Sequence, residues 1–372
     1  MRVVVAPDKF KGCLSALEVA RAVATGLQSG RPDTVTTVLP VADGGDGTVA
    51  AALAAGYGKV VVAVEGPTGR RAQAPYAVRG REAVVELAVA CGLDLLPEGR
   101  REPMLASTYG LGQVIADAVA RGATRIVLGL GGSASTDGGA GMVQALGARL
   151  LDRDGRELGR GGGALGDLAT LDPAGLPGLA GAAVVVANDV DNPLLGPRGA
   201  AAVFGPQKGA LPSQVQQLEA ALTCWADLVE GAVGSDRRHE RGAGAAGGTG
   251  FAALALLGAV ARPGIELVLD LVDFDTAVAG ADLVVTGEGS LDEQSLAGKA
   301  PVGVAAAAAR RGVPTVAVAG RSLLADRQLR QANILAAYPL AALEPDLARS
   351  ITHAPSLLRQ VGVTIAKEWL HG

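Results

Sequence analysis

Acidic residues and lysines gather where strands of this sequence are predicted to end. The acids are Asp8, Asp43, Asp46, Asp189, Asp191, Glu288 and Asp292, and the lysines are Lys9, Lys11, Lys208 and Lys299. Phosphoryl transfer from a nucleotide needs carboxylates to hold Mg²⁺, cations on the phosphates and a base near the acceptor hydroxyl. A single aspartate at such a position more often caps a helix or closes a turn. Seven acids at predicted strand ends favour a shared site.

A glycine-rich stretch could supply contacts to phosphate. Residues 126–130 form an apolar run of strand length, and a helix is predicted over residues 142–148. Between them lie Gly131, Gly132, Ser133, Ser135, Thr136, Gly138 and Gly139. Such a turn can direct backbone N–H groups at an anion, where the dipole of the following helix is favourable. We expect this segment to bind phosphate, although a tight turn without a ligand has the same pattern.

A second glycine run lies within residues 242–250 and precedes an apolar helix predicted from Phe251. It contains Gly244, Gly247 and Gly248. We hypothesise that it also receives phosphates.

A dinucleotide-binding fold is the main alternative. Residues 129–134 fit the spacing G-x-G-x-x-A after a strand, with Asp152 about twenty residues further on. The first strand-to-helix turn, residues 7–12, lacks this fingerprint. No Walker A motif is present either, because Glu293 and Ala300 stand where a glycine and a hydroxyl are required. A nicotinamide-dependent dehydrogenase and a non-catalytic sensor of small anions therefore stay open beside a phosphotransferase.

The predicted elements would bring these residues together. The chain begins with strand 3–6, a helix through Leu27, strand 35–41, helix 48–55 and strand 59–64. Ser15 and Glu18 fit a capping box at the start of the first helix. The alternation returns after Asp282, with strands 283–286 and 315–319 and helices 302–310 and 357–370. This order predicts a doubly wound parallel sheet, whose ligands bind at the carboxyl ends of the strands.

The middle of the chain has a different pattern. It contains a predicted hairpin of residues 74–78 and 83–87, a strand over 182–187 and a long helix over 213–229. We therefore predict an α/β protein of two domains. Residues 1–66 and 281–372 would form a doubly wound, Rossmann- or flavodoxin-like domain. Residues 67–280 would form an inserted mixed α/β domain that carries the glycine-rich phosphate loops.

Composition narrows the class of partner. The formal net charge of −4 and the pI of about 5.5 disfavour nucleic acid or an anionic membrane as a partner. The longest apolar run, residues 251–261, is too short to span a bilayer, and the first residues lack a signal-peptide pattern. The 3 cysteines are too scattered for a zinc site, and the 3 histidines leave chemistry to carboxylates, lysines and backbone amides. We expect a cytoplasmic protein, with a homodimer left open as its assembly.

Taken together, the motifs resemble the type I glycerate kinase family almost from end to end. The segments that carry the resemblance are APDKFKG (residues 6–12), PVADGGDGT (40–48), GGSASTDGG (131–139), DVDNPL (189–194), FGPQKGA (204–210), the glycine run 242–248, TGEG (286–289) and Gly298-Lys299. No segment is decisive alone, but their order is specific. The resemblance implies ATP-dependent phosphorylation of D-glycerate, usually to 2-phosphoglycerate, Mg²⁺ dependence, and two domains with the active site in the cleft between them.

On this basis we assign expected roles. Asp189, Asp43 and Lys9 are expected to be catalytic, with Asp189 as the general base, and Asp189, Asp43 and Asp292 are the expected Mg²⁺ ligands. Asp8, Lys11, Lys208 and Asp46 are expected to bind glycerate. Glu288 and Lys299 are expected to join the glycines and hydroxyls of both glycine-rich segments at the nucleotide.

Overall fold

A computed structural model describes residues 1–97, 100–176 and 179–371. The chain forms two compact units. The first contains Met1–Asp43, Ala50–Gly56 and Gly264–Gly372, and the second contains Gly44–Val49 and Tyr57–Pro263. Within the described ranges, no helix combines the length and the apolar character needed to cross a membrane.

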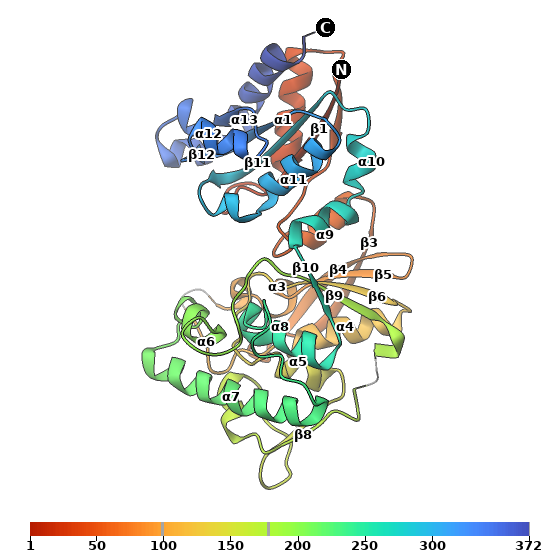
Figure 1. Ribbon diagram of the computed structural model, residues 1–372, viewed down its shortest axis with the longest axis vertical. Helices are drawn as coiled ribbons and strands as arrows, with labels where there is room; N and C mark the ends of the chain where they lie inside the picture. The colour runs from red at the N-terminus through yellow and green to blue at the C-terminus, as the bar shows by residue number, and fades with distance from the viewer. Residues whose placement is uncertain (98–99, 177–178, 372) are drawn as a thin grey trace. The chain divides into compact units, whose positions relative to one another are not determined.

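A parallel sheet forms the centre of the first unit (Figure 1). Its strands follow the order β13-β12-β11-β1-β2, and each neighbouring pair is parallel. The strands are β1 (Arg2–Pro7), β2 (Val35–Val38), β11 (Leu283–Leu291), β12 (Thr315–Ser322) and β13 (Ala337–Pro339). The apolar runs of β1 and β11 are buried on both faces, as a parallel sheet covered by helices requires.

Successive residues of a strand point to opposite faces of this sheet, and each face has its own helices. Val3 and Val5 pack in a core with α1 (Ala16–Gly30) and α13 (Leu347–Trp369), which lie side by side (Figure 1). Val4 and Ala6 pack in another core with α9 (Gly264–Leu271), α10 (Phe274–Val278) and α11 (Ala300–Arg310). The remaining helices of this region are α2 (Thr48–Ala54) and α12 (Asp326–Gln331).

The start of α1 confirms the predicted capping box. The amide of Glu18 donates to Ser15 Oγ at 3.3 Å, and the amide of Ser15 donates to Glu18 Oε2 at 2.9 Å. Further along, a Cβ on Gly26 would lie 2.1 Å from the carbonyl oxygen of Arg359, so glycine permits the close approach of α1 to α13.

Helix α13 is longer than the predicted helix 357–370, because it continues through Pro355. A proline inside a helix leaves the carbonyl one turn earlier without its usual amide donor. That carbonyl belongs to Ile351, and it accepts a hydrogen bond from Cys13 Sγ at 3.5 Å. The thiol of Cys13 thus replaces the amide donor that Pro355 lacks.

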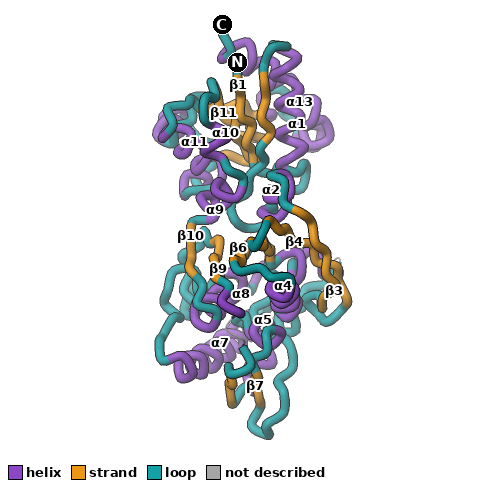
Figure 2. The backbone as a smooth tube through the Cα atoms, turned by 90° about the vertical axis from the view of Figure 1, so that its right-hand side faces the viewer, coloured by secondary structure: helices purple, strands orange, loops and turns teal. Residues whose placement is uncertain are grey.

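The second unit is built on a mixed sheet in the order β10-β9-β6-β5-β4-β3. Its strands are β3 (Gly58–Glu65), β4 (Arg71–Arg79), β5 (Glu82–Glu86), β6 (Arg125–Gly129), β9 (Ala183–Ala187) and β10 (Val260–Arg262). β3, β4 and β5 are antiparallel neighbours, and β3 and β4 lie side by side in Figure 2. β5, β6, β9 and β10 pair in parallel. A separate antiparallel pair consists of β7 (Arg149–Leu151) and β8 (Thr170–Asp172).

Helices bury one large core against this sheet. They are α3 (Ala88–Cys91), α4 (Tyr109–Ala120), α5 (Ala140–Ala145), α6 (Ala200–Phe204), α7 (Pro212–Val233) and α8 (Ala245–Leu256). Trp225 of α7, Phe251 of α8 and Met142 of α5 are fully buried there with Ile126 and Leu128 of β6. The core therefore fixes β6 and α5, the two elements that flank the first glycine-rich segment.

The two units differ from the predicted division at 66/67 and 280/281. β3 pairs with β4 along residues 58–65, so it belongs to the mixed sheet and not, as expected, to the sheet of β1. Residues 264–280, which form α9 and α10, belong to the first unit. The prediction places β3 wrongly because a strand that follows two strand–helix repeats has the pattern of a third repeat.

Candidate active site

Three carboxylates of the first unit lie at the carboxyl ends of adjacent parallel strands. Asp8 follows β1 directly, and its amide donates to the carbonyl of Gly287 on β11 at 2.8 Å, one residue before Glu288. Beyond β2 the chain continues beside β1, because the amide of Val41 donates to the last residue of β1 at 3.0 Å. This path carries Asp43 to the same edge of the sheet. Strand order thus brings together three of the acids singled out in the sequence.

Asp8 has the most perturbed carboxyl group of this cluster. Its burial raises the pKa to about 7, Lys9 opposes the shift, and the negative charges of Asp43 and Glu288 add to it. The amide of Lys9 donates to Asp8 Oδ1 at 2.6 Å, while Lys9 Nζ lies 4.0 Å from the same oxygen. A carboxyl group with a pKa near neutrality can exchange a proton during a reaction.

Glu288 is buried beside Asp8 and carries an oxygen without a partner. Burial raises the pKa of Glu288; Ser295 and Lys299 lower it, and the charges of Asp292 and Asp43 raise it. Among the described residues, no group hydrogen-bonds its buried Oε1 atom. Because buried polar atoms normally have partners, this oxygen is suited to a cation or a substrate hydroxyl.

The other charged residues predicted in this unit have different surroundings. Lys11 is exposed, and Lys299 Nζ lies 3.4 Å from Gln294 Oε1. The carboxylate of Asp292 accepts from the amide of Gln294 at 3.0 Å and from Ser290 Oγ at 3.3 Å. Asp292 therefore closes the turn after β11, which opposes its predicted role as a metal ligand.

The donor set of this cluster fits a hard cation. In the described part of the chain, no three His, Cys, Asp or Glu side chains are already arranged around a metal position. The predicted ligands Asp43 and Asp292, both in the first unit, thus do not form a ready-made cage, and Asp189 belongs to the second unit. Mg²⁺ is usually held by one or two carboxylates together with substrate phosphates and water. Asp43 and the unpartnered oxygen of Glu288 match that requirement.

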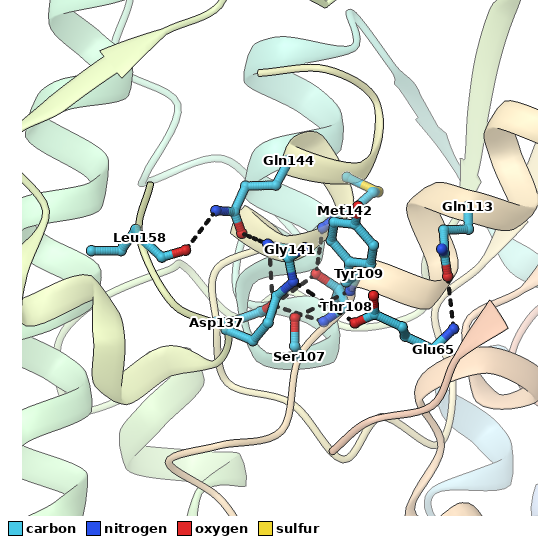
Figure 3. A network of polar contacts seen from close by, with 11 residues as sticks. Glu65, Ser107, Thr108, Tyr109, Gln113, Asp137, Gly141, Met142, Gln144 and Leu158 are labelled. Carbon is cyan, nitrogen blue, oxygen red and sulfur yellow. Dashed lines mark hydrogen bonds and ion pairs between the residues drawn. The ribbon is translucent and has the colours of Figure 1, made fainter. Parts of the chain in front are cut away.

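In the second unit, Asp137 is the centre of the first glycine-rich segment (Figure 3). Its Oδ2 atom accepts from the amide and the hydroxyl of Thr108, at 2.7 and 2.8 Å, and from the amide of Gly141 at 3.2 Å. Its Oδ1 atom accepts from the amide of Gly139 at 3.2 Å. The Thr108 hydroxyl in turn accepts from the amide of Met142 at 2.9 Å. A carboxylate of the chain itself thus occupies the anion position at the start of α5.

This network limits which residues of the first glycine-rich segment can bind phosphate. The buried members of this segment are Ser133, Ser135, Thr136, Gly138 and Gly139. The hydroxyls of Ser133 and Ser135 lie 3.0 Å apart and bond to each other. Gly131 and Gly132 keep contact with the surface. A bound phosphate can therefore reach the first two glycines of the segment, whereas the later residues build the support below them.

The second glycine run packs directly on the first. The amide of Gly138 donates to the carbonyl of Gly247 at 3.0 Å. A Cβ on Gly247 would lie 2.0 Å from the carbonyl oxygen of Ser135, and one on Gly248 would lie 2.8 Å from Gly138 Cα. Gly244 is equally crowded, because a Cβ on it would lie 2.2 Å from the carbonyl oxygen of Pro193. These buried glycines allow two backbones to touch, which differs from the predicted contact with nucleotide phosphates.

Lys208 lies under both segments. Only 2% of the residue is exposed, and Nζ donates a hydrogen bond to the carbonyl of Ser135. Burial lowers the pKa of Lys208 to about 8, and the carboxylate of Asp137 opposes this shift. The prediction that Lys208 binds glycerate requires an accessible ammonium group, and the ammonium group is enclosed.

The exposed edge of the first segment is formed together with the loop of residues 44–49. A Cβ on Gly131 would lie 2.6 Å from the amide nitrogen of Asp46 and 2.8 Å from Gly45 Cα, so the two backbones are in contact. The buried Glu86, at the end of β5, accepts from the amide of Val49 at 2.7 Å and fixes this loop. Asp46 is exposed and lies beside Gly131.

Asp189 is exposed on the loop that follows β9. The preceding Asn188 donates to the carbonyl of Val190 at 2.9 Å, and a Cβ on Gly242 would lie 1.7 Å from Asn188 Nδ2. Two residues later, Asp191 pairs with Arg241 at 2.7 Å. The loop is thus anchored on both sides of Asp189 to the segment that leads into the second glycine run.

Comparison with known proteins decides the family. A sequence model described as the glycerate kinase family matches residues 3–370. The chain belongs to the glycerate kinase family. Over 370 residues it is 45% identical to a glycerate kinase of Bacillus subtilis (strain 168), covering 98% of this chain and 97% of the relative. Over 324 residues it is 44% identical to a glycerate 2-kinase of Escherichia coli (strain K12), covering 86% of this chain and 85% of the relative.

A solved structure is similar to this chain along almost its whole length. It comes from Salmonella typhimurium LT2 and is described as a candidate glycerate kinase 2. Its TM-score with this chain is 0.86, at 42% sequence identity, and the match covers 99% of this chain and 97% of the other.

Family membership and structure both oppose the dinucleotide-binding alternative. In that fold the helix begins at the glycines. Here residues 130–139 separate β6 from α5. Asp152 follows β7, which pairs with β8 outside the main sheet. The G-x-G-x-x-A match at residues 129–134 is therefore coincidental.

Sequence reasoning missed Asp137, Thr108 and Glu86 as organising residues of this kinase-family fold. An aspartate just before a helix is a capping signal, so the sequence did contain a hint for Asp137. Thr108 and Glu86 carry no local signal, because each acts on a backbone amide that is distant in sequence.

Proposed function

We propose that the protein transfers the γ-phosphoryl group of ATP to D-glycerate and forms 2-phosphoglycerate. The names of the relatives support this activity, as does membership of the family. The structural observation that carries the proposal is the carboxylate cluster of Asp8, Asp43 and Glu288, with Lys9 and Lys299 as the nearby cations. Acids for a metal and cations for phosphate are what phosphoryl transfer needs from a protein.

In the first unit, we assign Lys9 and Lys11 to the carboxylate of glycerate. Asp43 and Glu288 would hold Mg²⁺, since Asp292 is engaged in its own turn. When bound, Mg²⁺ neutralises charge on the nucleotide phosphates. Lys299 would add positive charge next to Glu288.

In the second unit, we assign the exposed edge at Gly131 and Gly132 to the phosphates of ATP. Glycine allows a phosphate oxygen to approach the backbone amides closely. Asp46, exposed at the same edge, would meet a hydroxyl of glycerate or the metal. The buried network of Asp137 keeps this edge rigid, which favours in-line positioning of the reacting groups.

Two residues are candidates for the general base. Asp189 is exposed on an anchored loop, so its carboxylate can meet an acceptor hydroxyl. Asp8 has a pKa of about 7, which suits proton exchange at neutral pH. Asp189→Asn and Asp8→Asn separate them: the base is the residue whose amide variant lowers kcat far more than it raises KM. An unchanged kcat removes a residue from this role.

An ADP-release assay tests the activity. The purified protein is supplied with ATP and, in turn, D-glycerate, L-glycerate and other hydroxy acids, each with Mg²⁺ and with EDTA. We expect ADP only with D-glycerate and Mg²⁺. NAD(P)H formation from a hydroxy acid when NAD(P)⁺ is added in place of ATP, or glycerate binding without turnover, would contradict the proposal. The predicted cytoplasmic location and homodimer are checked by cell fractionation and by light scattering.

A further inference from the structure

Lys208 lies where the two glycine-rich segments meet. It ends a short 3₁₀ turn, Pro206–Lys208, and its Nζ donates to the carbonyl of Ser135 in the first segment. A Cβ on Gly247, in the second segment, would lie 2.8 Å from Nζ and 2.0 Å from the same carbonyl oxygen. The ammonium group thus contacts one segment and is covered by the other.

We propose that Lys208 is a positioning residue that fastens these two segments to each other and contacts neither ATP nor glycerate. Its effect reaches the nucleotide through Ser135, which is followed in the same segment by Asp137 and preceded by the half-buried Gly131 and the exposed Gly132. The inference rests on the proposed function only where it names ATP as the ligand of that edge.

In the folded protein the charged form of Lys208 is less stable than the neutral form, so the role of this charge is not to stabilise the fold. Burial lowers its pKa from 10.5 to about 8, so the unfolded chain binds more protons than the folded chain between these two values. The free energy of unfolding therefore rises as the pH increases from about 8 to 10.5, and the charged form is the less stable one. Asp137 is the carboxylate that offsets this destabilisation, and it has its own hydrogen-bond donors.

Chemical labelling distinguishes a positioning residue from a residue that contacts a ligand, and it does not require catalytic turnover. The sequence contains 6 lysines, so an amine-acylating reagent with peptide mass spectrometry can follow each one. We expect Lys208 to resist acylation in the substrate-free protein and equally with ATP, Mg²⁺ and D-glycerate, while the exposed Lys59 reacts in both states. If Lys208 is acylated in the substrate-free protein and ATP or glycerate suppresses this acylation, the proposal is overturned.

Two variants test the consequence for nucleotide binding. Lys208→Met should weaken ATP binding in calorimetry at least 10-fold, with an unfolding temperature at pH 7 equal to or above that of the wild type. Lys59→Met on β3 is the control and should change neither value. Wild-type ATP affinity should fall above pH 8, where Lys208 loses its proton, and the affinity of Lys208→Met should not. Unchanged ATP affinity in Lys208→Met, or a loss of stability with the affinity intact, would overturn the proposal. If Lys208→Met does not fold, the labelling result decides.

Discussion

The amide and the hydroxyl of Thr108 both donate to one oxygen of Asp137, at 2.7 and 2.8 Å. Thr108 stands at the start of α4, and Asp137 stands before α5. One buried carboxylate therefore joins the beginnings of two helices and holds the glycine-rich segment between β6 and α5. This segment has the composition of a phosphate loop, but the anion that its deeper amides bind belongs to the protein.

We predict that Asp137→Asn destabilises the protein by about 2–4 kcal/mol, because a buried carboxylate with charge-assisted hydrogen bonds becomes an amide whose NH₂ faces donors. Urea unfolding measures this change. Asp154→Asn is the matched control: its carboxylate pairs with Arg156 at 2.6 Å on the exposed surface, where such pairs contribute at most about 1 kcal/mol. Equal effects of the two variants would show that the Asp137 network is not a main support of the fold.

We predict that Gly247→Ala lowers stability and ATP affinity together, because its Cβ would lie 2.0 Å from the carbonyl of Ser135. Gly247 also has a φ of +70°, so part of the effect is backbone strain. Gly234→Ala separates the two causes, since Gly234 has a φ of +74° and open space around its Cβ position. The strain alone should cost about 1 kcal/mol. Indistinguishable unfolding curves and ATP affinities for the two variants would show that the contact between the glycine segments supports neither stability nor ATP binding.

The sequence predicts much of this fold because local signals and global structure agree. Valine-rich apolar runs predicted β1 and β11, and Ser15 with Glu18 predicted the start of α1. The order of strands in a sheet has no local sequence signal, so β3 was predicted in the wrong sheet. The acids of the first unit could be predicted as a group, because parallel strands end at one edge. The role of the deeper glycines could not, since backbone packing and phosphate binding require the same residue.

We predict that the contribution of Asp8 to stability depends on pH. Its pKa is raised from 3.8 to about 7, so the folded protein keeps a proton that the unfolded chain loses between these values. The stabilisation is complete below pH 3.8 and is lost as the pH rises through 7. At pH 8, Asp8→Asn should therefore be more stable than the wild type by roughly 1–3 kcal/mol, with a smaller difference at pH 5. Thermal unfolding in EDTA at both pH values measures this; a constant difference would contradict the shift.

We predict that Glu86 acts on the reaction through the loop that carries Asp46. Glu86→Gln keeps an oxygen that can accept from the amide of Val49 and should retain activity within about threefold. Glu86→Leu leaves that amide without this acceptor and should lower kcat/KM by about tenfold or more. Initial rates of ADP release at varied D-glycerate compare the variants. If Glu86→Leu and Glu86→Gln have the same kcat/KM, the hydrogen bond from the Val49 amide does not position the loop.

The proposed reaction phosphorylates the 2-hydroxyl of D-glycerate. Phosphorus NMR of a reaction with ATP, Mg²⁺ and D-glycerate identifies the phosphorylated carbon, because the coupling of the product's phosphorus to protons depends on which carbon carries the phosphate. We predict a doublet, from coupling to the single proton of the 2-position. A triplet from phosphate on the 3-position, or no new phosphate ester while ATP persists, would contradict it.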